Sequence, residues 1–445
     1  MTSAARFEFE YGNPGRLGED LHSFAAELYP ICRSITGDGT RVTLGKIAER
    51  IPLNVFDVAS GTNVFDWTVP KEWNIRDAWI KDAKGDRIVD FREHNLHVVN
   101  YSPPVRRRLS LSELRPHLHS LPDRPNWIPY RTSYYKEDWG FCLADNQLAD
   151  LREGEYEVCI DATLEDGSLC YGECFLPGSS TEEVLISVHV CHPSLANDNL
   201  SGVAVATALA QMMARGGNRY SYRFLFIPGT IGAITWLARH QNTLAQVRHG
   251  LVLTCIGDGG GFHYKKSRRG NAEVDRAMAH VLQHGGEAYE VVDFSPYGYD
   301  ERQYCSPGFN LPVGCLMRSV WGSFPEYHTS ADNLDFIRPQ QLARSFVLCR
   351  STIDVLENNR TFLNLNPFCE PQLGKRGLYR DTGGHQVDCQ IHARLWVLNL
   401  SDGDHSLLDI AERSGMPFAA IRDAAELLKD AGLLAEQATA PEHSE

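Results

Sequence analysis

The chain lacks the features that mark secreted and membrane-spanning proteins. No apolar run in its 445 residues approaches the roughly 20 residues that cross a bilayer. The first residues, MTSAARFEFEYGNPG, lack the basic start and apolar stretch of a secretory signal. The twelve cysteines form no C-x-x-C pair and lie mostly in apolar runs, which favours reduced core thiols over a disulfide framework. We therefore expect a cytoplasmic protein.

The chain is also poor in positive charge. It has 43 Lys and Arg against 57 Asp and Glu, a formal net charge of -14. This balance argues against non-specific binding to nucleic acid or to an anionic membrane. There is no internal repeat and no low-complexity tract, and the hydrophobic content of 43% is typical of a globular protein. The length predicts two or three domains.

Sequence patterns divide the chain into regions. Residues 17–30 predict an amphipathic helix, and short apolar runs such as NVFDWTV and LHVVNYS predict a small β-rich inserted domain over 51–135. Farther along, EYEVCIDATL and CYGECFL predict a pair of strands. The buried strands EVLISVHV, YRFLFIP, GLVLTCIG and LPVGCLMR then alternate with helices such as GVAVATALAQMMARGG. This alternation predicts an α/β domain with a mostly parallel sheet, formed by residues 1–50 and 136–375.

The C-terminal region, residues 376–436, predicts three short helices and a winged-helix-like domain, followed by a disordered tail over 437–445. DNA binding relies on neutralising phosphates, and the expected recognition helix carries more acids than bases. Its charged residues are Arg422 and Lys429 against Asp423, Glu426 and Asp430. We therefore expect no nucleic-acid partner. The inserted or the C-terminal domain could instead join copies of the chain into a homo-oligomer.

The candidate metal ligands lie in the segment HVCHPSLANDNLSG, which begins at the end of the buried strand EVLISVHV. It contains His189 and His192, three residues apart, and Asp198 in the loop before the next helix. Nitrogen and oxygen ligands in a compact shell suit zinc. The alternative is structural: the histidines bond to the backbone and the asparagines shape the loop. A second segment, EYHTSADNLDFI, offers His328, whose alternative role is a bond to Asp332.

Together these segments resemble the zinc aminopeptidases with two co-catalytic metals, and their relative glutaminyl cyclase. The resemblance implies that Asp198 bridges metals and that His328 is a ligand. A longer resemblance, over nearly the whole chain, is to a bacterial family of polysaccharide-biosynthesis proteins with an aminopeptidase-like domain. It implies a three-layer zinc-hydrolase domain, a small inserted β domain and a C-terminal winged helix. The motifs are LYPICRSITGDG, VPKEWNIRDAWIKD, LHVVNYS, IPYRTSYYKEDWGFC, HVCHPSLANDNLSG and DERQYCSPGFNLPVG.

The chain departs from that clan at its catalytic carboxylate. The peptidases carry Glu-Glu after the strand equivalent to YRFLFI, the first as general base and the second as metal ligand. This chain reads PGTIGA, with Gly229 and Thr230 at those positions. Losing positioned acid–base help usually lowers the rate by roughly 10²–10⁴-fold. The candidates for a replacement catalytic carboxylate are Glu326, Asp300 and Glu301; for the last two, a solvated loop pair is the alternative.

A second departure concerns the number of metal ions. The clan's Leu-Asp-Met-Val-Gly segment reads LTCIGDG here, with Thr254 at the aspartate position and Asp258 four residues on. With two ligands missing or displaced, we expect one ion rather than two. Zinc is the first expectation, although other divalent metals also suit such a site. The candidate ligands are Asp198, His328, Asp258 and one of His189 or His192, between which the sequence does not choose.

The substrate-binding candidates are Arg33, Tyr327 and Arg302. Arg33, in RSITGDG, could bind a carboxylate or phosphate, while a plain helix-stop loop is the alternative.

Two functions fit the chain. One is a metal-dependent hydrolase that cleaves an amide, peptide-like or N-acyl, in a biosynthetic or tailoring pathway. The other, favoured by Gly229, is an aminopeptidase-like binding or scaffold protein without turnover.

Overall fold

The computed structural model describes residues 14–378 and 389–437. The chain divides into unit 1, Met1–Ala272 with Ala288–Val347, and unit 2, Glu273–Glu287 with Leu348–Glu445. The predicted tail over 437–445 lies outside the described residues except for Gln437. In the described ranges, no helix combines the length and the apolar character that crossing a bilayer requires.

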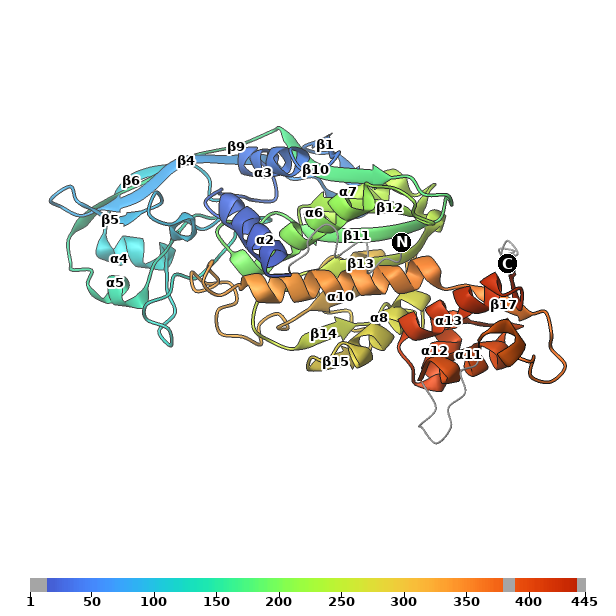
Figure 1. Ribbon diagram of the computed structural model, residues 1–445. Coiled ribbons are helices and arrows are strands. Elements are labelled where there is room, and N and C mark those ends of the chain that lie inside the picture. The colour runs from blue at the N-terminus through green and yellow to red at the C-terminus, as the bar shows by residue number, and fades with distance from the viewer. Residues whose placement is uncertain (1–13, 379–388, 438–445) are drawn as a thin grey trace. The chain divides into compact units, whose positions relative to one another are not determined.

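An eight-stranded sheet forms the centre of unit 1 (Figure 1). All seven residues of β11 (Glu183–His189) are buried, as expected for a strand covered on both faces. It runs parallel to β12 (Ser221–Ile227) and β13 (Val247–Leu253), and β13 runs parallel to β16 (Val313–Met317). The predicted, mostly parallel sheet is therefore confirmed. The strand order is β1-β10-β12-β11-β13-β16-β14-β15.

The outer strands of this sheet are mixed in direction. β10 (Ser168–Leu176) is antiparallel to β12 and to β1 (Asn54–Ala59). β14 (Phe262–Lys265) is antiparallel to β16 and parallel to β15 (Tyr289–Val292). β1 lies within the predicted inserted region over 51–135, yet it completes the main sheet.

Helices connect and cover the strands. α6 (Ser201–Met213) leads from β11 to β12, and α7 (Ile231–His240) follows β12. α2 (Pro14–Leu28), close to the predicted helix over 17–30, packs on α6 (Figure 1). This order brings the end of β11, the end of β12 and the start of α6 to one edge, where sites form in α/β sheets. The other helical elements include α3 (Asp38–Ala48), α9 (Glu301–Tyr304), α10 (Pro339–Asn358) and the 3₁₀ turn Leu244–Gln246.

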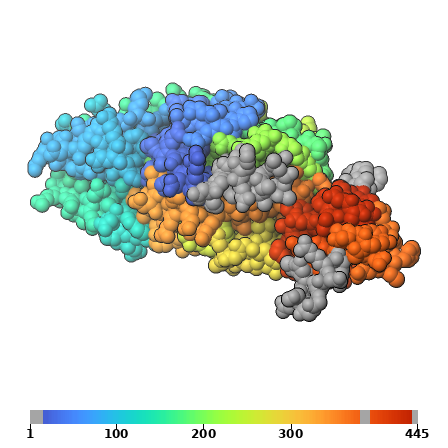
Figure 2. All heavy atoms as spheres, in the orientation of Figure 1, coloured from blue at the N-terminus to red at the C-terminus, as the bar shows by residue number. Residues whose placement is uncertain are grey.

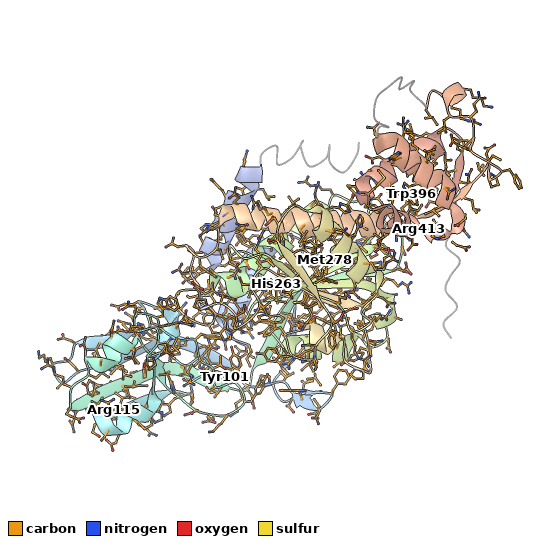
Figure 3. All side chains as sticks on the ribbon, turned by 90° about the horizontal axis from the view of Figure 1, so that it is seen from below. Tyr101, Arg115, His263, Met278, Trp396 and Arg413 are labelled. Atoms are coloured by element: carbon orange, nitrogen blue, oxygen red, sulfur yellow. The ribbon has the colours of Figure 1, made fainter. Side chains whose placement is uncertain are left out.

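A lobe of unit 1 is built on a second, antiparallel sheet of order β5-β4-β9-β6. Its light-blue to teal residues lie together in Figure 2, and Tyr101 and Arg115 mark it in Figure 3. The four strands are β4 (Glu72–Lys81), β5 (Arg87–Asp90), β6 (Val105–Ser110) and β9 (Glu155–Glu165). The shorter elements in this part of the chain are β2 (Asn63–Val64), β3 (Trp67–Thr68), β7 (Leu118–His119), β8 (Phe141–Cys142), α4 (Leu111–Leu114), α5 (Asp145–Ala149) and the 3₁₀ turns Asn95–His97 and Arg115–His117.

β9 and β10 are both strands, as predicted, but they belong to different sheets. β9 pairs with β4 and β6, whereas β10 pairs with β1 and β12. Their burial explains the difference. In β9 the buried residues alternate, as in a strand with one covered face, while β10 is buried along most of its length.

Unit 2 contains a small helical domain with its own sheet. α11 (Cys389–Leu400), α12 (Leu407–Ser414) and α13 (Phe418–Asp430) match the three predicted helices. Trp396 and Arg413 mark α11 and α12 in Figure 3. A three-stranded antiparallel sheet has the order β18-β17-β19, and β17 precedes the predicted boundary at residue 376. The remaining elements are β17 (Thr361–Asn364), β18 (Asp402–Ser406), β19 (Leu434–Glu436), the 3₁₀ turn Gly374–Arg376 and α8 (Glu273–His284).

Candidate metal centre

Three candidate ligands meet at the carboxyl end of β11. His189 is the last residue of that strand, and Asp198 lies in the turn Ala196–Leu200 that precedes α6. One donor atom each from His189, His192 and Asp198 lies within 4.8 Å of the others, and all three residues are buried. The structure therefore brings both histidines of the first motif to the same carboxylate.

The Asp198 carboxylate is the centre of the group. Its Oδ1 lies 2.8 Å from His189 Nε2, and its Oδ2 lies 3.9 Å from His192 Nε2 and 3.1 Å from His328 Nε2. Donor atoms around a tetrahedral zinc ion, each at about 2.0–2.1 Å, would lie about 3.3 Å apart. The observed separations bracket that value, and His189, His192 and Asp198 together offer the nitrogen and oxygen ligands that a divalent metal takes; His328 meets this group through Asp198 Oδ2.

The charge states also suit metal binding. Burial acts to raise the pKa of Asp198, but the neighbouring His192, His189 and His328 outweigh it and hold this pKa well below its usual range. Burial lowers the pKa of His192 well below its usual value. The site therefore presents an ionised carboxylate and a neutral imidazole, the forms that bind metal.

The lobe holds His328 in position. Tyr130 donates its backbone N–H to the His328 carbonyl at 2.7 Å, and Ile128 and Ser330 exchange two further hydrogen bonds. His328 has a φ of +55°, an uncommon conformation for a residue with a side chain. The centroid of its ring lies 3.9 Å from that of Tyr327, a substrate-binding candidate, and 5.1 Å from that of Tyr130.

Asp332 holds the loop that carries Asp198. Its carboxylate accepts hydrogen bonds from the backbone N–H groups of Asn197 at 2.6 Å and Asp198 at 3.0 Å. Its backbone carbonyl accepts a third from Ala196. Burial raises the pKa of Asp332 to about 8 despite these bonds. The carboxylate thus bonds to the first motif, whereas the sequence suggested a bond to His328.

Asp258 is not brought into the donor group. One of its oxygens accepts from Asn197 Nδ2 at 2.7 Å, and the other accepts from Gly260 N and Ser319 Oγ. Through its hydrogen bond with Asn197, the Asp258 carboxylate also helps to hold the loop that carries Asp198. The predicted role as a metal ligand has no support in these contacts.

None of the three carboxylates proposed as catalytic groups belongs to the group of metal donors found among the described residues. Glu301 is fully buried and paired with Lys265 at 2.5 Å. Asp300 is also buried, and neither of its oxygens has a hydrogen-bond partner among the described residues; burial, followed by Glu301, raises its pKa well above its usual value. The solvated-pair alternative is therefore wrong for both. Glu326 is half-buried, and its carboxylate makes no hydrogen bond or ion pair within the described ranges.

The two arginine candidates differ in their surroundings. Arg33 is only 1% exposed, and its Nε donates to the His192 carbonyl at 2.9 Å, so it supports a ligand residue from within the protein. Burial lowers the pKa of Arg33 to about 10. Arg302 is exposed on α9. A further neighbour, Tyr299, was missed at the sequence level: the centroid of its ring lies 4.2 Å from that of His189.

The chain matches two family models. Residues 22–359 match one described as domain of unknown function DUF4910, and residues 360–436 match one described as winged helix-turn-helix. The second match confirms the predicted winged-helix domain and begins at residue 360, so it includes β17 and therefore all three strands of the small sheet.

Known relatives agree with these matches. A Clostridium acetobutylicum protein named "putative polysaccharide biosynthesis protein with aminopeptidase-like domain" is 52% identical over 423 residues, covering 95% of this chain and 97% of its own. A crystal structure of a "putative peptidase" from Clostridium acetobutylicum has a TM-score of 0.93 at 50% identity, covering 97% of this chain and all of its own. A Bacillus subtilis zinc aminopeptidase shares the fold, with a TM-score of 0.55 at 11% identity over 76% of this chain and 94% of its own. The chain therefore belongs to the DUF4910 family, with an aminopeptidase-like fold followed by a winged helix.

Proposed function

We propose that this protein is a metal-dependent hydrolase that cleaves an amide, peptide-like or N-acyl, in a biosynthetic or tailoring pathway. One divalent ion, zinc in the first instance, would be held by Asp198, His328 and one of His189 or His192, which leaves a position for water. The observation that carries the proposal is the convergence of three imidazoles on one buried, ionised carboxylate. The name of the Clostridium acetobutylicum relative supports the setting, and the fold shared with a zinc aminopeptidase supports the metal.

Each residue of the centre has a role in this proposal. When bound, the ion polarises the amide carbonyl and makes water easier to deprotonate. Glu326 lies two residues before His328, and its carboxylate is unengaged within the described ranges. We assign it the role of accepting the proton of the attacking water. Tyr327, stacked on His328, would orient the substrate beside the ligands.

A second candidate function is binding without turnover. It is favoured by one observation: position 229 offers only a backbone carbonyl, and that oxygen accepts a hydrogen bond from the Tyr299 hydroxyl at 3.2 Å. A chain with this centre would bind a metal and a carbonyl ligand but would lack the usual proton acceptor.

Elemental analysis of the purified full-length protein tests the centre. We expect about one divalent ion per chain, lost in Asp198→Ala and His328→Ala and retained in His405→Ala, which changes a histidine in unit 2. A metal-free natural protein, or unchanged stoichiometry in Asp198→Ala, would contradict the proposal.

Activity separates the two candidate functions. The metal-loaded protein would be assayed on aminoacyl and N-acyl p-nitroanilides. Because Gly229 provides no carboxylate, we expect weak turnover of aminoacyl substrates, with any hydrolysis lowered about 10²–10⁴-fold in Glu326→Gln. Metal binding with no hydrolysis of any substrate would favour the binding function.

We also propose that the protein acts in the cytoplasm and has no nucleic-acid partner. Eleven of the twelve cysteines, Cys32 to Cys369, are free thiols, which fits a reducing compartment. The cations of α13 are engaged by acidic groups: Arg422 by Asp354 and Asp423, and Lys429 by Glu436. They are therefore poorly placed to neutralise phosphates.

A further inference from the structure

An aromatic ring fills the space beside Gly229. A Cβ atom built at this glycine would lie 2.0 Å from Cε1 of Tyr299, 2.5 Å from its Cζ and 2.7 Å from its hydroxyl oxygen. Real Cβ atoms essentially never approach other heavy atoms closer than 3.0 Å. The obstacle to any side chain at position 229 is therefore the ring of a residue 70 positions away in the sequence.

Contacts at both ends hold this ring in place. The Tyr299 hydroxyl donates to the Gly229 carbonyl and lies 3.5 Å from Cys191 Sγ. The backbone N–H of Tyr299 lies 3.1 Å from both carboxylate oxygens of Glu301, which is itself paired with the buried Lys265. Moving the ring aside would break its hydroxyl contacts with Gly229 and Cys191, while the backbone of Tyr299 stays bonded to the buried Glu301.

The same ring packs against the metal centre. Its centroid lies 4.2 Å from that of His189 and 6.0 Å from that of His192. Aromatic rings at these separations attract one another. Tyr299 thus touches a candidate ligand and position 229 at once.

We propose that Gly229 and Tyr299 form a matched pair, in which the tyrosine occupies the space of a side chain at 229 and acts as a positioning residue for His189. The proposal rests on the metal centre of the proposed function. Its consequence is that a carboxylate can enter position 229 only if residue 299 is made small at the same time. A single change at 229 forces the ring onto His189, whereas the two changes together leave room.

The stability test uses a double-mutant cycle on the metal-free full-length protein. The four proteins are the natural chain, Gly229→Ala, Tyr299→Ser and the double variant. Because overpacking a buried site costs about 1–3 kcal/mol, we expect Gly229→Ala alone to lower Tm by roughly 1–3 °C. In the Tyr299→Ser background the same change should lower Tm by less than roughly 0.5 °C. Equal losses in both backgrounds, or no loss in either, would overturn the proposal.

The functional test introduces a carboxylate at position 229. Zinc-loaded Gly229→Glu/Tyr299→Ser would be assayed on leucine p-nitroanilide beside Gly229→Gln/Tyr299→Ser, which has a similar shape without the charge. We expect kcat/KM at least about 100-fold higher for the glutamate pair than for the glutamine pair. Equal activity in the two pairs would overturn the inference that a carboxylate can enter position 229 and act there once residue 299 is small.

The two tests separate this inference from the proposed function. Failure of the natural chain to bind zinc would contradict the proposed function, while the metal-free stability cycle would still decide whether the pair is matched. Zinc affinity of Tyr299→Ser, measured by competition with a chelator, reports on His189 directly. A loss of about 10-fold or more supports the positioning role, because groups that orient metal ligands contribute on this scale; unchanged affinity contradicts it.

Discussion

Single buried residues outside the donor set decide whether the metal loop keeps its shape. Asp332 accepts two backbone N–H groups from the loop that carries Asp198, and Asp258 reaches the same loop through Asn197. These bonds leave the Asp198 oxygens free to face the histidines. The loop geometry therefore depends on carboxylates that touch no candidate histidine.

A prediction at this scale concerns Asp332→Asn. The amide can accept only through its single oxygen, so one of the two loop N–H groups should lose its partner. We expect zinc affinity to fall about 10–100-fold, as for other groups that orient metal ligands. Chelator competition measures it, with the exposed Asp335→Asn as control. Unchanged affinity in Asp332→Asn would show that the loop holds its shape without this carboxylate.

Individual elements of unit 1 are joined by buried polar groups. Lys265, the last residue of β14, pairs with Glu301 of α9, and both are buried. Lys265 also donates to the Tyr297 carbonyl at 2.7 Å. This pair ties a strand of the main sheet to the segment that holds Tyr299.

Breaking the ion pair between Lys265 and Glu301 should destabilise the folded protein. In Lys265→Met the Glu301 charge stays buried without its partner, so we expect a loss of roughly 3–5 kcal/mol in the free energy of unfolding. Lys265→Met/Glu301→Gln should recover part of the loss because the charge is gone as well. Urea denaturation gives the values. The surface pair of Lys266 and Asp293 provides the control, since Lys266→Met should cost no more than about 1 kcal/mol.

A second prediction for an element concerns pH and β13. Burial lowers the pKa of His249, on this strand, to about 3. In the unfolded chain the pKa of this histidine is about 6.5. Below that pH the unfolded state therefore binds a proton that the folded state does not bind. Stability must therefore fall as the pH drops from about 6.5 toward 3. Between pH 6 and 5, His249→Leu should lose about 1 kcal/mol less in the free energy of unfolding than the natural protein, as urea denaturation at each pH would measure.

For the whole molecule, the boundary of the C-terminal domain decides which truncations are tolerated. β17 lies between β18 and β19 in the small sheet, and Arg276 of α8 pairs with Asp409 and Glu412 of α12. A protein cut after residue 375 keeps β17 and Arg276 but loses all of these partners. We expect a lower Tm and self-association, measured by calorimetry and light scattering. Deleting only residues 438–445 is the control, and an unchanged Tm in the longer deletion would contradict the prediction.

DNA binding is the second prediction for the whole molecule. Because acidic groups engage Arg422 and Lys429, we expect weak binding without sequence preference at physiological salt. Fluorescence anisotropy with duplexes of varied sequence measures it. Sequence-specific binding near 10⁻⁸ M, the weak end of typical specific affinities, would instead assign the winged helix a regulatory role.

The sequence by itself determined the parts whose information is local. Continuous apolar runs marked β11, β12, β13 and β16, and the short spacing from His189 to Asp198 placed two donor types in one connection beyond a strand. The long motifs identified the family. Each of these features extends over a short stretch of chain, where the periodicity of side chains fixes the element they form.

Only the tertiary structure decided which distant residues touch. It assigned β9 and β10 to different sheets, fixed His328 through residues 128–130 of the lobe, and turned Asp258 and Asp332 toward the metal loop. It also placed the Tyr299 ring where a side chain at Gly229 would lie. These contacts join residues far apart in the sequence, and no local pattern encodes them, because they depend on how side-chain shapes fill the space between packed elements.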